Sequence, residues 1–303
     1  MIEMKISINS DTTVLNTESD IDILKSGYSR IFNVGFDGTD QSIPPVSYGS
    51  PLKSSEEFKR WAYSVEEAVS LAGGHFAQCH CPVITRAEYG GFVHGEEEKR
   101  TYDDIFRAVR NWDCPMVVHP INLPGFSEDS MLDEYLRINV AFFNMLLEYA
   151  EKYNVKIAAE NLFDIPNSAR HFCSKPQNLK YIIDNVNSPL VGVCIDTGHA
   201  LVSGIEPNIF LNVFGEKVFA LHIHDNNGFS DQHNLPPFGS IDWNKFIEAL
   251  KSINYTGYFN YEVNGGKVYD MPMSAGDAYL SYAYKFAVAL TNCKKSDNFL
   301  VNS

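Results

Sequence analysis

The feature that most constrains the fold is a regular alternation of short apolar runs with longer amphipathic stretches along the chain. Runs such as Val155–Leu162 are rich in apolar residues and are bounded by turn residues, as buried parallel strands are. The stretch Met131–Tyr153 instead repeats apolar residues every three or four positions, which is typical of one buried helix face. Eight such strand–helix units in 303 residues predict an α/β fold, a (β/α)8 TIM barrel formed as a single domain over residues 1–303.

The expected elements follow from this pattern. The strand-like runs are Met4–Ile8, Arg30–Phe36, His75–Pro82, Pro115–Ile121, Val155–Leu162, Leu190–Asp196, Val218–His224 and Gly257–Val263. The helix-like stretches are Ile21–Ser26, Ser54–Leu71, Tyr102–Trp112, Met131–Tyr153, Lys175–Val186, Glu206–Phe214, Asp242–Ile253 and Ala275–Leu290. An open doubly wound sheet is disfavoured, because the G-x-G-x-x-G turn that often follows the first strand of such sheets does not occur.

The charge balance limits the classes of partner. The chain has 24 Lys and Arg against 38 Asp and Glu, which gives a net charge of -14. Because nucleic acids are bound through clustered Lys and Arg, we expect no nucleic-acid partner. No apolar run approaches the length of a membrane-spanning helix, so we expect no membrane partner. The scattered cysteines and the absence of signal-peptide features in Met1–Lys5 favour a cytoplasmic protein.

Metal-competent side chains follow the ends of six consecutive expected strands. In a barrel of this type the carboxyl ends of the strands meet at one rim, where the active site lies. A single carboxylate there commonly caps a helix, but repetition at six strands favours a divalent metal site. Mixed imidazole and carboxylate ligands suit Zn2+ or Mn2+. These residues are His80, His119, Glu160, Asp196, His222 and Glu262, with His199, His224, Asp231 and His233 close behind in the sequence.

Several short motifs carry a family resemblance. They are Glu160-Asn161, Gly192-Val-Cys-Ile-Asp-Thr-Gly-His199, Leu221-His-Ile-His-Asp-Asn226, Asp231-Gln-His233 and Tyr261-Glu262. Together they resemble the xylose isomerase-like TIM barrel superfamily. That superfamily includes sugar phosphate isomerases and epimerases, ketose 3-epimerases, inosose dehydratases and endonuclease IV. Its members share a metal frame and differ in their loops, so the resemblance implies the frame more firmly than the reaction.

The resemblance implies a metal-dependent isomerase or epimerase that acts on a sugar or sugar phosphate. One divalent ion, Zn2+ or Mn2+ with Co2+ also compatible, would be held by Glu160, Asp196, His222 and Glu262. Glu160 and Glu262 would also exchange a substrate C–H proton through an enediolate. His199, Asp225 and His233 would contact the hydroxyl groups of the sugar or polyol substrate. Relatives in the superfamily are often oligomers, so a homo-oligomer is expected.

Two alternatives remain open at this stage. The first is a keto-polyol dehydratase that resembles inosose dehydratase and uses the same metal frame. The second is a multinuclear zinc phosphodiesterase that resembles endonuclease IV, in which His80, His119, His199, Asp231 and His233 would hold further metal ions. In the isomerase interpretation those five residues instead bind substrate or a second ion.

Overall fold

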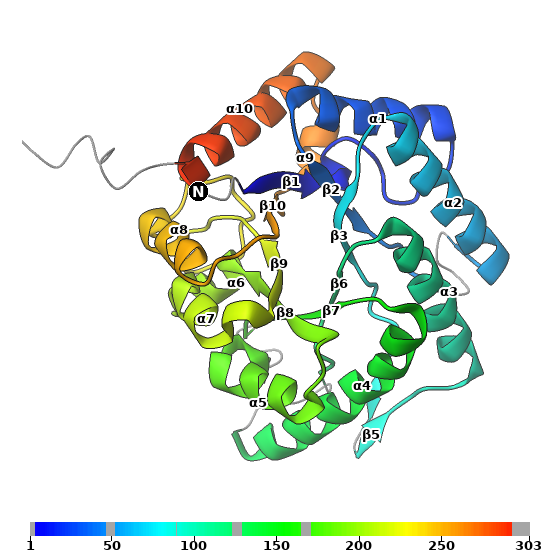
Figure 1. The fold of residues 1–303 in the computed structure, drawn as a ribbon, viewed down its shortest axis with the longest axis vertical. Coiled ribbons are helices and arrows are strands. Elements are labelled where there is room, and N and C mark those ends of the chain that lie inside the picture. Colours follow the sequence, from blue (N-terminus) through cyan, green and yellow to red (C-terminus); the bar gives the residue numbers. More distant parts are fainter. Residues whose placement is uncertain (1–3, 47–51, 89, 123–128, 165–170, 293–303) are drawn as a thin grey trace, which may run out of the picture.

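A computed structural model describes residues 4–46, 52–88, 90–122, 129–164 and 171–292. Its main feature is one sheet of eight parallel strands in the order β10-β1-β2-β3-β6-β7-β8-β9, surrounded by helices (Figure 1). The strands are β1 (Lys5–Asn9), β2 (Gly38–Ser42), β3 (Phe76–His80), β6 (Met116–Val118), β7 (Ile157–Glu160), β8 (Val191–Asp196), β9 (Val218–His222) and β10 (Tyr258–Tyr261). The predicted (β/α)8 barrel is confirmed.

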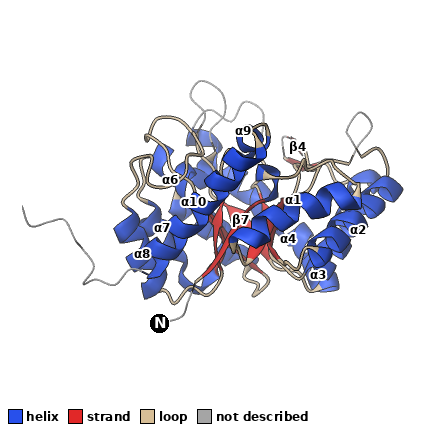
Figure 2. Ribbon diagram, turned by 90° about the horizontal axis from the view of Figure 1, so that it is seen from above, coloured by secondary structure: helices blue, strands red, loops and turns tan. Residues whose placement is uncertain are grey.

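The helices form the outer layer, and the red strands lie inside it in Figure 2. They are α1 (Ile21–Val34), α2 (Ser55–Leu71), α3 (Glu96–Trp112), α4 (Leu132–Tyr153), α5 (Pro176–Val186), α6 (Thr197–Val202), α7 (Pro207–Phe214), α8 (Trp243–Ser252), α9 (Gly265–Tyr269) and α10 (Met273–Asn292). A short antiparallel pair, β4 (Ala87–Glu88) and β5 (Gly91–Phe92), lies in the connection between β3 and α3. None of the described helices is both long enough and apolar enough to cross a membrane.

The first and last strands of the sheet meet through a short pairing. Ile223, directly after β9, forms a parallel bridge with Tyr261 at the end of β10. The Ile223 N–H donates to the carbonyl of Asn260 at 2.8 Å, and the Glu262 N–H donates to the carbonyl of Ile223 at 3.1 Å. These bonds close the barrel directly beneath the two side chains His222 and Glu262.

The prediction for the second strand was wrong. Arg30–Phe36 does not form a strand, because α1 continues to Val34 and stops at Gly35, whose φ of 121° suits glycine. Leu24, Tyr28 and Ile31 form the buried stripe of that helix at intervals of four and three residues. The actual strand, β2, has the sequence Gly-Thr-Asp-Gln-Ser and is buried over most of its length. It lacks apolar residues, so hydrophobic periodicity gave no indication of it.

Candidate metal centre

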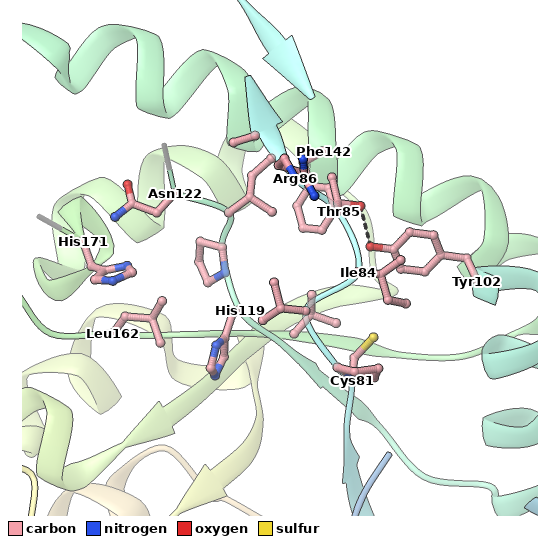
Figure 3. Close-up of a pocket in the computed structure, with 16 residues that line it drawn as sticks. Cys81, Ile84, Thr85, Arg86, Tyr102, His119, Asn122, Phe142, Leu162 and His171 are labelled. Carbon is pink, nitrogen blue, oxygen red and sulfur yellow. Dashed lines mark hydrogen bonds between the residues drawn. The ribbon is translucent and has the colours of Figure 1, made fainter. Parts of the chain in front are cut away.

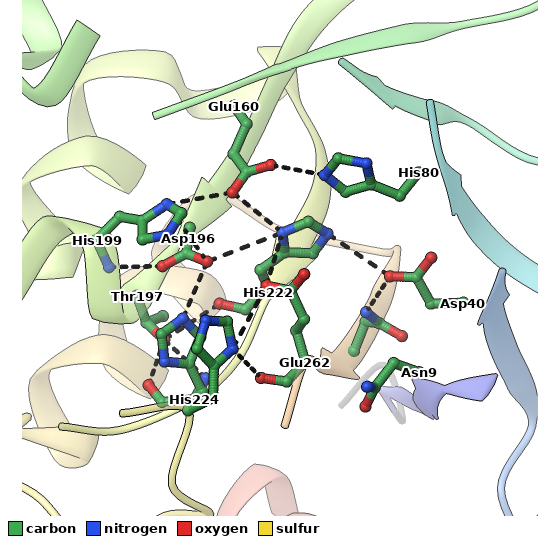
Figure 4. A network of polar contacts seen from close by, with 12 residues as sticks. Asn9, Asp40, His80, Glu160, Asp196, Thr197, His199, His222, His224 and Glu262 are labelled. Atoms are coloured by element: carbon green, nitrogen blue, oxygen red, sulfur yellow. Dashed lines mark hydrogen bonds and ion pairs between the residues drawn. The ribbon is translucent and has the colours of Figure 1, made fainter. Parts of the chain in front are cut away.

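Four side chains from neighbouring strands form what we call the central group. Glu160 ends β7, Asp196 ends β8, His222 ends β9, and Glu262 directly follows β10 (Figure 4). One potential ligand atom from each lies within 4.8 Å of those of the other three. His222 Nδ1 lies 3.3 Å from Glu160 Oε1 and 3.2 Å from Glu262 Oε2. Parallel strand ends therefore bring together four residues that are far apart in the sequence.

The central group has the chemistry expected of a cation site. Its three carboxylates face a single imidazole, and Glu160, Asp196 and His222 are almost completely buried. Neither ring nitrogen of His222 has a hydrogen-bond partner of normal geometry among the described residues. Unpartnered polar atoms at this depth are costly, and a divalent ion between the carboxylates and Nδ1 would satisfy them. The four residues therefore fit a bound Zn2+ or Mn2+.

The electrostatic surroundings keep two of the carboxylates ionised. Burial opposes ionisation of Glu160, but His222 and His119 hold its pKa well below its usual range. Burial likewise opposes ionisation of Asp196, whereas His199 and His224 lower its pKa. Both carboxylates therefore carry their charge at neutral pH, as metal ligands must.

A second group, which we call the histidine pair, consists of His80 and His119 beside Glu160. His80 Nε2 lies 3.1 Å from His119 Nε2 and 3.3 Å from Glu160 Oε2, and His119 Nε2 lies 3.1 Å from the same oxygen. His80 Nδ1 is 3.0 Å from the carbonyl oxygen of Cys81, which can only accept, so this nitrogen carries the proton. In the neutral ring, Nε2 then directs its lone pair toward His119 and Glu160, as in a ligand oriented by a carbonyl.

A third group, which we call the histidine-rich group, lies on the other side of the central group. It consists of His199, His224, Asp231 and His233. His199 Nδ1 lies 2.9 Å from the carbonyl of Asn161, and His233 Nδ1 lies 3.0 Å from the carbonyl of Glu262. Both rings are thereby oriented with Nε2 toward Asp231, at 3.5 Å and 2.8 Å from its Oδ2. The sequence-predicted residues His199, Asp231 and His233, together with the histidine pair, thus lie around the central group, and their roles remain predictions.

Two further residues contribute to the site: His224, which the sequence pattern placed at this rim without a specific role, and Asp40, which it missed. His224 donates toward Asp196 Oδ2 at 3.0 Å and stacks on His233 with ring centroids 3.9 Å apart. Asp40 of β2 lies behind His222, with its Oδ2 3.6 Å from His222 Nε2. Asp40 Oδ2 also accepts hydrogen bonds from Gln78 at 2.9 Å and Asn260 at 3.0 Å. The spacing of His224 two residues after His222 was a usable signal, because alternate residues of a strand share a face.

Asp225, expected from the sequence to contact substrate, has a completely buried side chain whose oxygens are held by neighbouring groups. Oδ2 accepts from Trp243 Nε1 at 2.9 Å, and Oδ1 accepts from the Asn226 N–H at 2.9 Å and the Ile241 N–H at 3.2 Å. Asp225 therefore anchors the loop that carries Asp231 and His233, and its contact with substrate stays a prediction.

Comparison with proteins of known sequence gives relatives of several kinds. An uncharacterised protein of Methanocaldococcus jannaschii is 33% identical over 150 residues, which are 48% of this chain and 50% of that protein. A probable endonuclease 4 of Mycoplasma capricolum is 29% identical over 148 residues, 45% of this chain and 48% of the relative. The inosose isomerase of Bacillus subtilis is 26% identical over 154 residues, 48% of this chain and 54% of the relative. The chain thus matches about half the length of these curated relatives.

Solved structures share the fold over nearly the whole chain. A D-tagatose 3-epimerase-like protein superposes with a TM-score of 0.70 at 21% identity, covering 95% of this chain and 98% of the other. The IolI protein with a zinc atom bound gives the same TM-score and coverage at 18% identity. The profile of the xylose isomerase-like TIM barrel family matches residues 33–280. The chain therefore belongs to the xylose isomerase-like TIM barrel family.

Proposed function

We propose that the protein is a carbohydrate isomerase or epimerase that uses one divalent metal ion, Zn2+ or Mn2+, at the central group. The observation that carries this proposal is the placement of two glutamates from different strands, Glu160 and Glu262, beside the same nitrogen, His222 Nδ1, at 3.3 Å and 3.2 Å. Their strands, β7 and β10, are separated in the sheet by β8 and β9. An epimerase needs one carboxylate to remove a proton from one face of a sugar carbon and a second carboxylate to return a proton to the other face.

The chain's own residues have distinct parts in this proposal. A bound divalent ion would polarise adjacent hydroxyl and carbonyl oxygens of the sugar and so acidify the intervening C–H group. Glu160 is held ionised by the surrounding histidines, so it begins the cycle able to accept a proton. Glu262, a quarter of whose side chain is exposed, returns a proton on the opposite face. His199 and His233 lie where they can hold substrate hydroxyl groups.

The proposal is tested by exchange of a substrate C–H proton with solvent deuterium, followed by NMR over a panel of ketoses. Glu160→Gln and Glu262→Gln are each expected to lower the exchange rate by about 10²–10⁴-fold, the usual contribution of a general acid or base. Glu151→Gln, on the exposed surface of α4, is the matched control and is expected to behave as the unaltered protein. Normal exchange in both site variants would remove the two glutamates from these roles.

A second candidate function is favoured by the histidine pair and the histidine-rich group. With three zinc ions, the three groups would suit a phosphodiesterase, in which the ions activate water and stabilise charge on the phosphate. Elemental analysis of protein purified without chelator distinguishes the two candidates. One ion per chain supports the isomerase, whereas three zinc ions together with cleavage of an abasic-site DNA duplex would replace it.

A keto-polyol dehydratase is the remaining alternative on the same metal frame. It would differ from the isomerase in its product, because the substrate would lose one molecule of water. Mass spectrometry of the products from ketoses, and from an inosose added to the panel, distinguishes the dehydratase from the isomerase, since an isomerisation leaves the mass unchanged.

A further inference from the structure

A pocket of about 410 Å³ opens beside the metal centre, and we call it the side pocket. It lies between the segments that follow β3, β6 and β7 and is bounded by α3 and α4 (Figure 3). His119 belongs to both places, because it lines the side pocket while its Nε2 lies 3.1 Å from Glu160 Oε2. The side pocket and the metal centre therefore share His119 as a common wall.

The walls of the side pocket are chemically unlike the metal centre. They are formed largely by apolar side chains, including Ile84, Val118, Phe142 and Leu162. No carboxylate is among the described residues that line it. Hydroxyl groups placed against these walls would lose their hydrogen bonds to water without replacement, whereas apolar groups would gain from burial.

Most polar groups in the walls are paired or uncharged, and the exception is His171, whose buried Nδ1 has no hydrogen-bond partner among the described residues. The hydroxyl groups of Thr85 and Tyr102 bond to each other at 2.7 Å, so neither is directed at a ligand. Burial and the neighbouring His119 lower the pKa of His171 to about 4, so its ring is neutral at pH 7. Arg86 supplies the formal charge in the wall, and its side chain is exposed. A phosphate group would therefore meet one exposed cation in largely apolar surroundings.

We propose that the side pocket receives an apolar aryl or alkyl substituent of the substrate, so that the substrate class is a substituted sugar that keeps a carbonyl group, rather than an unsubstituted sugar or a sugar phosphate. The carbonyl is required because a simple glycoside has no C–H group that an adjacent carbonyl can acidify. The inference rests on the proposed function, because the sugar portion is placed at the central group. The volume agrees with it, since pockets of roughly 300–1,000 Å³ are typical of small-molecule sites. In this arrangement the carboxylates and histidines bind the oxygen-rich part of the substrate, and the side pocket binds its apolar part.

The test compares three probes by isothermal titration calorimetry on the metal-loaded protein: phenyl β-D-glucoside, methyl β-D-glucoside and glucose 6-phosphate. The phenyl glucoside is expected to bind at least about 10-fold more tightly than the methyl glucoside, because the ring adds buried apolar area. Equal binding of the two glucosides, or no binding of the phenyl glucoside at millimolar concentration, would overturn the inference. Tighter binding of glucose 6-phosphate that is lost in Arg86→Gln would overturn it in favour of an anion site.

Two variants locate the effect in the side pocket. Ile84→Asp introduces a charge at a half-buried wall position, and Ile84→Trp fills the space, so both are expected to abolish the preference for the phenyl probe. Ile23→Asp, at an exposed position of α1, is the matched control and should keep the preference. A preference that persists in both Ile84 variants would contradict the inference.

These binding measurements need no turnover, so they separate the two proposals. A phenyl preference in a protein without proton exchange would refute the isomerase alone. Proton exchange on free ketoses without a phenyl preference would refute the side-pocket inference alone.

Discussion

The central group and the histidine-rich group are neighbours, but they are built from opposite proportions of the same ligands. The central group has three carboxylates and one imidazole, and the histidine-rich group has three imidazoles and one carboxylate. Each group combines buried residues with partly exposed ones, Glu262 in the first and Asp231 and His233 in the second. Oxygen-rich sites suit Mn2+ as well as Zn2+, and nitrogen-rich sites favour Zn2+. If both groups bind ions, as proposed, they would differ in their preference among metals.

The two groups also differ in what they do without a cation. In the histidine-rich group, Asp231 pairs with His233 at 2.8 Å, and the pKa of His233 rises to about 9 despite burial, chiefly because Asp231 favours its charged form. That group can balance its own charge. The central group leaves His222 without a hydrogen bond and gathers three carboxylates around it. The difference indicates that the central group depends more strongly on a bound ion.

The largest expected effect comes from removing one carboxylate from each group. Asp196→Asn weakens the central site, and we expect activity to fall by about 10²–10³-fold, as when one electrostatic stabilising group is lost from an active site. Asp231→Asn is the matched variant in the histidine-rich group and is expected to cost only about 10-fold. Proton-exchange rates and metal content per chain provide the measurements. Equal losses in both variants would mean that the two groups act as one metal cluster.

The next effect in size is a loss of stability, and it concerns the loop that supplies Asp231 and His233. Asp225→Ala removes the acceptor of three hydrogen bonds in a completely buried place. The free energy of unfolding is expected to fall by about 3 kcal/mol, because buried hydrogen bonds to charged groups are worth about 1.5–3 kcal/mol each and act here in concert. Urea unfolding followed by circular dichroism measures it. A change below the experimental error would show that the loop holds its position without Asp225.

A smaller effect, on metal affinity, is expected from changing Asp40, which lies behind His222. Asp40→Asn removes the charge that faces His222 Nε2 at 3.6 Å, and metal affinity at the central group should fall by about 10–100-fold. Competition with a chromophoric chelator measures the affinity directly. Asp20→Asn, at the N-cap of α1, is the control, because asparagine caps a helix as well as aspartate. Unchanged affinity in Asp40→Asn would assign Asp40 to barrel packing only.

The smallest expected effect concerns how the stability of the protein depends on pH, through Asp11 beside the central group. Burial, with a contribution from Glu262, raises the pKa of Asp11 to about 6, so the folded protein holds a proton that the unfolded chain releases near pH 4. Stability contributed by this group is therefore lost as pH rises from about 4 to 6. Asp11→Asn should flatten that slope and add about 2 kcal/mol of stability at pH 7.

Urea midpoints measured across this pH range check the Asp11 prediction. The exposed Asp270 provides the control variant Asp270→Asn, which should keep the slope of the unaltered protein. If Asp11→Asn kept the slope of the unaltered protein as well, the raised pKa would not belong to Asp11.

The half of the barrel that carries the proposed ligands could be placed from the sequence because two signals coincide there. Strands such as β8 are apolar and buried, and each ends in a single polar residue, as at Asp196. The periodicity of the long helix α4 likewise gave its bounds to within one residue. Apolar burial and strand-end chemistry are local properties, and the sequence displays both directly.

The opposite side of the barrel could not be predicted in the same way. β2 carries Thr39, Asp40 and Gln41 in buried positions, where they are stabilised by partners from other strands such as Gln78 and Asn260. Such a strand has no hydrophobic period, because its burial is made favourable by side chains distant in sequence. Asp40 was missed for this reason, and the hydrogen bond between Asp225 and Trp243 was likewise missed because it is recognisable only in three dimensions.

The short pairing that closes the barrel has a mechanical consequence. Among the described residues, only the bridge between Ile223 and Tyr261 joins the two end strands of the sheet, β9 and β10, and His222 and Glu262 flank it. An ion held by both side chains would be a cross-link over the least-paired boundary of the sheet. When the ion is removed, amide hydrogen exchange should therefore begin at the boundary between β9 and β10. Whether an ion is bound at the central group would then determine where the barrel first opens.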